Sequence, residues 1–298
     1  MLSTLSAHPI RWLLFVVWLG VFLSQSEPLV LALNYGGFTF LGILGAIFAN
    51  STGAGGGVVF MPFFNQLGFS VATSVATSFA IQCFGMTAGA ITWWVYYRNL
   101  GLTKATEVQE WQALPKLTYI CVPFSLLGVW SVQILPQFFA YFSDPQSLHT
   151  GFGVFSICLA ISIFATVLLL KNKPIKLQLN SVDYCALILI SYVGGGITAW
   201  LSIGVGELLA VYLIIRGFNV TLAIAAAVIL SAFTVWGGIL FHLIETRAVY
   251  WPVVLFAGIG AAIGGILAKH LVMYFSARNL KLFFAGWVFL LGISSLPF

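Results

Sequence analysis

The residues best suited to binding chemistry gather in two glycine-rich interruptions of apolar sequence. The first break (residues 50–57) contains Asn50, Ser51, Thr52, Gly53, Gly55, Gly56 and Gly57. The second break (residues 201–207) comes about half the chain later and contains Ser202, Gly204, Gly206 and Glu207. Glycine lets successive backbone N–H groups turn toward one point, and a half-helix that begins after the turn adds its positive dipole end. The two breaks therefore predict an anion site built mainly from backbone groups.

Polar side chains on the helix after the first break extend this candidate site. Thr77 and Ser78 lie there, and Gln82 follows Ser78 by one helical turn, so that Ser78 and Gln82 share a face. We expect that face to look toward the first break. Two alternatives stay open: the glycines merely allow close helix packing, and the hydroxyls bond back to carbonyls one turn earlier. Ser231 stands at the position of Gln82 in the second half.

Glu207 is the strongest single candidate for a functional residue, because it lies between Gly206 and Leu208, deep in apolar sequence. A carboxyl group inside a membrane is costly and is a functional candidate by default. One hypothesis is proton coupling, in which Glu207 gains and loses a proton during a transport cycle. The alternative is a structural role, in which Glu207 accepts backbone N–H groups at the start of a helix and fills the second break itself.

The composition identifies the class of protein that carries these breaks. The chain of 298 residues is 61% hydrophobic and only 6% charged, with a mean hydropathy of +1.06, whereas soluble domains carry about 25% charged residues. We expect one integral membrane domain over residues 1–298. The net charge of +5 is then an orientation signal in loops, and no nucleic-acid partner is expected. Without CxxC, HExxH or GxSxG patterns, we expect no metal, no cofactor and no catalytic residue.

Apolar runs of sufficient length predict spanning helices at 10–26, 70–97, 117–135, 148–170, 219–243, 250–274 and 279–297. Two further segments, 37–66 and 183–216, are too long for one simple span, and each contains a break. Each segment either crosses once as a broken helix or enters and returns as a re-entrant hairpin. If both return, every basic residue except Arg247 falls on the cytoplasmic side, as the positive-inside rule prefers. We therefore expect two hairpins.

This reading predicts an all-α, multi-pass protein of the cytoplasmic (inner or plasma) membrane, built from two inverted repeats. An extra N-terminal helix at about 10–26 precedes repeat 1 (about 37–170) and repeat 2 (about 183–297). Each repeat has one broken re-entrant hairpin and about three transmembrane helices. Because the repeats start on opposite sides, their hairpins dip toward the midplane from opposite faces, which suits alternating access.

Two features outside the breaks carry structural expectations. Arg216 ends the second hairpin and is expected to be an anchor whose charged end reaches the membrane surface. The Gly260-xxx-Gly264 pair fits a close contact between helices, either within the fold or between two copies of the chain. A homodimer is therefore one open possibility.

One sequence pattern carries a family resemblance: Gly53-Ala54-Gly55-Gly56-Gly57, then Pro62, Gly68 and Thr77-Ser78. It resembles the TauE/SafE family of membrane transporters, and the resemblance covers about residues 36–297. It implies movement of a small sulfur-containing anion, such as sulfite, sulfoacetate or another organosulfonate, often as export. The second half departs from the pattern, with Glu207 where the family usually has glycine and Leu213 where proline is common.

The expected function is therefore transport of a small anionic substrate across the lipid bilayer, with proton coupling as one hypothesis. An anion channel, or a transporter for an unrelated small anion or solute, is the alternative. A channel would share the glycine breaks but show flux without coupling or saturation. A membrane scaffold would not need two polar breaks in apolar sequence.

Overall fold

The computed structural model describes residues 9–100, 105–139, 175–294 and 296, together with most positions between 150 and 165. These residues form helices and connections, with no strand among them. The predicted helix at 148–170 is described only within 150–165, where it is helical. Four charged loop residues used in the orientation argument lie outside the described part of the chain: Lys104, Asp144, Lys171 and Lys173.

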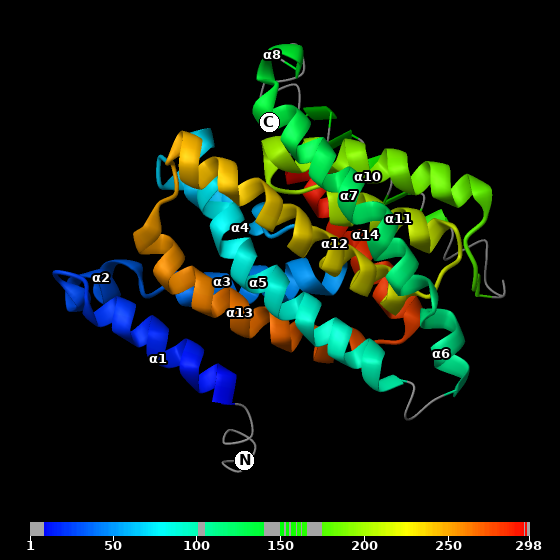
Figure 1. The fold of residues 1–298 in the computed structure, drawn as a ribbon, viewed down its shortest axis with the longest axis horizontal. Helices are drawn as coiled ribbons and strands as arrows, with labels where there is room; N and C mark the ends of the chain where they lie inside the picture. The colour runs from blue at the N-terminus through cyan, green and yellow to red at the C-terminus, as the bar shows by residue number, and fades with distance from the viewer. Residues whose placement is uncertain are drawn as a thin grey trace.

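The helices follow the predicted spans closely (Figure 1). In chain order they are α1 (Pro9–Leu23), α2 (Pro28–Tyr35), α3 (Phe38–Thr52), α4 (Gly57–Gln66), α5 (Val71–Leu100), α6 (Ala105–Trp111), α7 (Ala113–Ile134), α8 (Pro136–Phe139), α10 (Ser181–Leu201), α11 (Val205–Ile215), α12 (Val220–Phe241), η2 (His242–Thr246), α13 (Trp251–Tyr274) and α14 (Ala277–Ser294). Both breaks separate two helices, α3 from α4 and α10 from α11. The sequence had placed each break inside one long segment, and the structure agrees.

Several helices are long and apolar enough to cross a membrane. Within the described residues there are five, α5, α7, α10, α12 and α13, or up to six if the bent pair α1 and α2 counts as one span. An all-helical, polytopic membrane protein is therefore confirmed. The helix α10 has 21 residues, about 31 Å at 1.5 Å per residue. The segment 183–216 is thus a full-length helix followed by a shorter one.

The centre of the molecule is an antiparallel pair formed by α5 and α12 (Figure 1). The ring of Phe79, near the start of α5, lies 5.1 Å from the ring of His242, just after the end of α12. Further along, Trp236 Nε1 donates to Thr87 Oγ1 at 2.8 Å. Around this pair, α13 packs on α3 and α5, while α7 packs on α10 and α12. Both broken segments are therefore held by helices from the other half of the chain.

Glycines let the helices around the breaks approach backbone to backbone. A β-carbon added at Gly260 would lie 2.0 Å from the carbonyl oxygen of Thr39, and one at Gly264 would lie 2.3 Å from that of Ile43. The predicted Gly260-xxx-Gly264 contact therefore joins α13 to α3 within the fold. On the other side, a β-carbon at Gly128 of α7 would lie 2.0 Å from a carbonyl oxygen of α10. Close packing of this kind is how small residues stabilise membrane helices.

Some of the basic residues that the sequence assigned to the cytoplasmic side can be placed within the described part of the chain. Lys269, near the end of α13, lies 5.5 Å from the ring centre of Tyr96, near the end of α5. Asn219, which caps the start of α12, donates to Glu110 of α6. Figure 1 shows α6 and the end of α5 at the right of the view, the same end as the start of α10. This placement is compatible with the predicted orientation.

Candidate functional site

The first break begins where α3 ends in a left-handed residue. Gly53 has φ of +79°, a conformation that glycine adopts without strain, and its N–H donates to the Ala49 carbonyl at 2.9 Å. Thr52 Oγ1 donates to the Phe48 carbonyl at 2.9 Å and accepts the Ala54 N–H at 3.3 Å. Thr52 therefore stabilises the turn itself, and two of the N–H groups in this break already have protein partners.

The second break is built in the same way from different side chains. Ser202 ends α10 with φ of +59°, and its N–H donates to the Thr198 carbonyl at 2.8 Å. Thr198 Oγ1 accepts the N–H of Val205, the first residue of α11, at 3.1 Å. Gly204, with φ of +136°, is the N-cap of α11. A threonine hydroxyl thus organises each break.

The two breaks also match in backbone conformation and in register. Gly53 and Ser202 are both left-handed, and so are Gly68 and Gly217, which follow the half-helices with φ of +72° and +88°. The sequence separation from Gly53 to Ser202 equals that from Gly68 to Gly217. Ser202 adopts this conformation without being glycine, which costs of order 1 kcal/mol or more and is common at functional sites. The strain indicates that the position of Ser202 matters.

The two breaks meet at Gln82 of α5. Gln82 Oε1 accepts the N–H of Gly56 at 2.9 Å, and Gln82 Nε2 donates to Ser202 Oγ at 2.7 Å and to the Ser202 carbonyl at 3.0 Å. Ser78 Oγ accepts from Gln82 Nε2 at 3.1 Å and from Ser202 Oγ at 2.9 Å. Ser78 and Gln82 share a face as predicted, and Gln82 contacts the first break, whereas Ser78 contacts Ser202 of the second break. We call Ser78, Gln82, Ser202 and Gly56 the junction.

The backbones of the two breaks are in direct contact beside the junction. A β-carbon added at Gly206 would lie 2.1 Å from the Gly53 carbonyl oxygen and 2.3 Å from Ser231 Oγ. At Gly55 and at Gly57 it would lie 2.7 Å and 2.9 Å from the Ser202 carbonyl oxygen. These glycines therefore do allow close packing, as the alternative interpretation held, but the packing is between the two candidate binding elements.

Four polar atoms in or near the breaks are buried without a hydrogen-bond partner: Asn50 Oδ1, Ser51 Oγ, Glu207 Oε2 and Ser231 Oγ. Asn50 uses its other amide atom, Nδ2, to donate to the Ala46 carbonyl at 2.8 Å. Each unpartnered buried polar group costs about 1–3 kcal/mol. Native proteins keep such groups rarely, so they point to a polar ligand or water at this place.

Thr77 does not lie at the junction. Its Oγ1 accepts the N–H of Tyr250 at 3.0 Å, and the hydroxyls of Tyr250 and Tyr35 lie 2.6 Å apart. The ring of Tyr250 also lies 4.9 Å from the ring of Phe69. Thr77 therefore fixes the start of α13, where these aromatic residues hold together the two ends of the first broken segment.

Glu207 lies in the first turn of α11 and is fully buried. Its Oε1 accepts from Ser156 Oγ at 3.2 Å, and its Oε2 has no partner. The expectation that Glu207 would accept backbone N–H groups is wrong, since none of the described residues donates one to it. The half-helix leaves the carboxyl pointing at a neighbouring helix instead. Ser156, in the helical stretch at 150–165, was not identified from the sequence, because it is one isolated serine among apolar residues.

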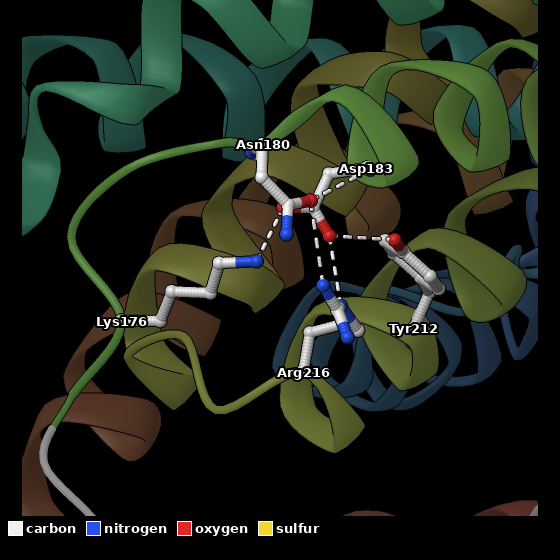
Figure 2. Close-up of polar contacts among 5 residues, drawn as sticks. All are labelled: Lys176, Asn180, Asp183, Tyr212 and Arg216. Carbon is white, nitrogen blue, oxygen red and sulfur yellow. Dashed lines mark hydrogen bonds and ion pairs between the residues drawn. The ribbon is translucent and has the colours of Figure 1, made fainter.

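A second polar cluster, around Asp183, joins the start of α10 to the end of α11, which together form the base of this broken segment (Figure 2). The buried carboxylate of Asp183 accepts from Lys176 Nζ, from Arg216 Nε at 2.8 Å, from Tyr212 Oη at 2.7 Å and from the Asn180 N–H at 2.9 Å. Arg216, which the sequence predicted to be a surface anchor, is partly exposed and is also ion-paired with Asp183. Sequence reasoning missed Asp183, although Asn180 and Asp183 have the spacing of a helix capping box.

The Asp183 cluster brings the two ends of the second broken segment together. The N–H of Lys176, before α10, donates to the carbonyl of Gly217, after α11, at 3.0 Å. The start of α10 and the end of α11 therefore lie side by side, as Asp183 and Arg216 do in Figure 2. The break lies at the far end of the segment, next to Gln82.

The junction gathers polar groups that suit a small polar solute, and in this structure they are bonded to one another. Gln82 is 3% exposed, and Ser78 and Ser202 are not exposed at all, so the junction is closed from solvent. Its donors are an amide, hydroxyls and backbone N–H groups, which suit an anion. No group of three or more His, Cys, Asp or Glu side chains in the described parts of the chain could hold a metal ion.

Comparison with known proteins agrees with this geometry. Residues 38–295 match the family described as sulfite exporter TauE/SafE, a range that contains both breaks and all helices from α3 to α14. No curated protein and no solved structure matches the chain. The matched range is most of the sequence, and so the chain belongs to the sulfite exporter TauE/SafE family of membrane transporters.

Proposed function

We propose that the protein carries a small sulfur-containing anion, such as sulfite, sulfoacetate or another organosulfonate, across the cytoplasmic membrane by alternating access. The anion binds where the two breaks meet. The observation that carries this proposal is the junction itself, in which one amide, Gln82, joins Gly56 of the first break to Ser202 of the second. Membership of a sulfite exporter family supports the substrate class.

The junction contains the groups that an anion of this kind needs. In the closed form, Gln82 Oε1 takes the Gly56 N–H that an anion oxygen would accept. When the breaks part, that N–H and the donors of Gln82 Nε2 and Ser202 Oγ become available together. The first N–H groups of α4 and α11 have no partner within their own helices and add positive helix ends. The site is smaller than the open glycine nest that the sequence suggested, because Gly53 and Ala54 donate to protein oxygens.

Alternating access follows if the two halves form inverted repeats. The antiparallel pair α5 and α12, the matching breaks and the reciprocal packing of α3 on α13 and α10 on α7 support that arrangement. The aromatic cluster around Tyr250 closes the first broken segment near the start of α5, and the Asp183 cluster closes the second near the start of α12. Because α5 and α12 are antiparallel, the two bases lie at opposite ends. Each segment then controls access from one side of the membrane.

Anion binding tests this proposal directly. Thermal unfolding of the detergent-purified protein is measured with sulfite, sulfate, thiosulfate, sulfoacetate, taurine and chloride. A ligand that binds only the folded form stabilises it by about 2.7 kcal/mol at a hundredfold over its dissociation constant. We expect a sulfur-containing anion to raise the unfolding temperature and chloride to have no such effect. If chloride stabilises the protein as well as every sulfur anion does, the proposed substrate class is wrong.

Two matched variants test whether the anion binds beside the first break. Ser51→Ala removes a buried hydroxyl that has no protein partner, so folding is retained while the anion-dependent shift falls. Ser24→Ala, at the exposed end of α1, keeps the full shift. In proteoliposomes, uptake that saturates and is accelerated by the same anion on the other side indicates a carrier. Flux that rises linearly with concentration, without exchange, would favour a channel.

A further inference from the structure

We propose that Glu207 is a proton site coupled to the anion: its carboxyl group holds a proton while the anion is bound, so that one proton and one anion move together. This inference rests on the proposed function and extends it by naming the coupled ion and its residue. It concerns a buried carboxyl group in the second break, one residue away from Gly206.

Glu207 lies next to the point at which the two breaks touch. The preceding residue, Gly206, packs against the Gly53 carbonyl oxygen and Ser231 Oγ. The carboxyl group itself is 0% exposed, with Oε1 bonded to Ser156 Oγ at 3.2 Å and Oε2 without a partner. A protonated carboxyl has one oxygen that donates and one that accepts, whereas a carboxylate needs donors at both. Among the described residues, Ser156 is the one donor to this carboxyl group.

No described positive charge balances Glu207. The neighbouring helices α12 and α3 contain no titratable side chain, and Cys158 is the one such residue in the described part of 150–165. On α10 the titratable residues are Tyr184, Cys185, Tyr192 and Asp183, and Tyr212 of α11 donates to Asp183. The nearest basic residues in sequence, Lys176 and Arg216, are both paired with Asp183. An ionised Glu207 would be an isolated buried charge, which proteins avoid by neutralising the group.

An anion at the junction strengthens this preference. Two negative charges in a low-dielectric interior repel each other, so a bound anion favours the protonated form of Glu207. By reciprocity, a protonated Glu207 favours the anion. The proton is taken from water on the side where the anion enters and released on the other side. No bond within the anion changes, and a monovalent anion crosses without net charge.

The linkage has a measurable size. Where Glu207 of the empty site is ionised, binding one anion takes up one proton, and the apparent affinity falls about tenfold for each unit that the pH rises. Where Glu207 of the empty site already holds its proton, affinity is independent of pH. The affinity curve therefore has a flat acid limb and a falling alkaline limb.

The test measures this curve for the full-length protein in detergent. The probes are thiosulfate and sulfoacetate, whose charges stay constant from about pH 6 to about pH 9, the window in which the linkage is scanned. We expect the wild type to lose affinity at alkaline pH. Glu207→Gln, which keeps the shape and cannot ionise, should hold one affinity throughout. The matched control is Glu245→Gln, at an exposed carboxyl of η2, which should keep the wild-type curve.

A second variant keeps the test valid if Glu207→Gln fails to fold. Ser156→Ala removes the hydroxyl that donates to Oε1 and stabilises the charged form, so the falling limb should move to higher pH. The inference is overturned if Glu207→Gln retains the wild-type curve, if wild-type affinity does not depend on pH, or if Ser156→Ala moves the falling limb to lower pH or leaves it in place. Absence of anion binding by the wild type at every pH overturns the proposed function, and this inference with it.

Discussion

Replacing Gly206 with alanine should force the two breaks apart. The added β-carbon would lie 2.1 Å from the Gly53 carbonyl oxygen and 2.3 Å from Ser231 Oγ. The serine can rotate away, but the carbonyl belongs to the backbone of the first break and has to move by about 1 Å to reach an ordinary contact. Overpacking of this kind costs about 1–3 kcal/mol. Alanine gains up to about 1 kcal/mol over glycine within a helix, and less in the first turn, so a net destabilisation remains.

The control for this change is Gly286→Ala in α14, where an added β-carbon meets nothing within 4 Å. That variant should be as stable as the wild type or more stable by up to about 1 kcal/mol. The assay is thermal unfolding in detergent, followed by exchange of the stabilising anion in proteoliposomes. Gly206→Ala should unfold at a lower temperature than both other proteins and lose exchange, because the closed form is no longer reached. Equal unfolding temperatures with full exchange would show that the breaks do not touch as described.

Three further changes test other parts of the same structure. Asp183→Asn leaves Lys176 and Arg216 without their carboxylate and should reduce the free energy of unfolding by up to about 3 kcal/mol. The loss is smaller than at a fully buried ion pair, because both basic side chains are partly exposed. An unchanged chemical unfolding curve would contradict this expectation. Gln82→Leu leaves polar groups of both breaks without hydrogen-bond partners, so the free energy of unfolding should fall by about 1–3 kcal/mol for each group. The same variant should abolish the anion-dependent thermal shift, and a retained shift would exclude Gln82 from the site. Thr198→Val removes the acceptor for the first N–H of α11 and should lower stability by about 1 kcal/mol without changing the affinity for the anion.

The helices and the two breaks were predictable because each depends on local sequence. A membrane helix needs a continuous apolar run, and nearly every predicted span is within a few residues of a helix in the structure. Gly53 and Gly217 mark turns that require positive φ, which few other residues adopt. The face shared by Ser78 and Gln82 also followed from helical spacing alone.

The contacts across the molecule were not predictable in this way. Gln82 meets Ser202, and Glu207 meets Ser156, through packing of helices that are far apart in the chain. A single sequence contains no signal for which helix faces which. The ion pairs of Asp183 were not predicted for another reason. A single acidic residue at a helix start is typical of an ordinary capping residue, and its basic partners become apparent only in the folded structure.

Each break begins with a left-handed residue, but the two breaks differ in chemistry, and that difference indicates that the two halves have different roles. In the first half, the long amide of Gln82 reaches across and satisfies both breaks. At the matching position in the second half, Ser231 is too short to do so, and its hydroxyl is left without a partner. The same half supplies Glu207, a carboxyl with one free oxygen. Both halves supply hydrogen-bond donors to the junction, Gln82 from the first and Ser202 from the second. The second half also supplies the buried carboxyl group of Glu207, where the equivalent position of the first half is Val58, and the proposed coupling of a proton to the anion requires this asymmetry.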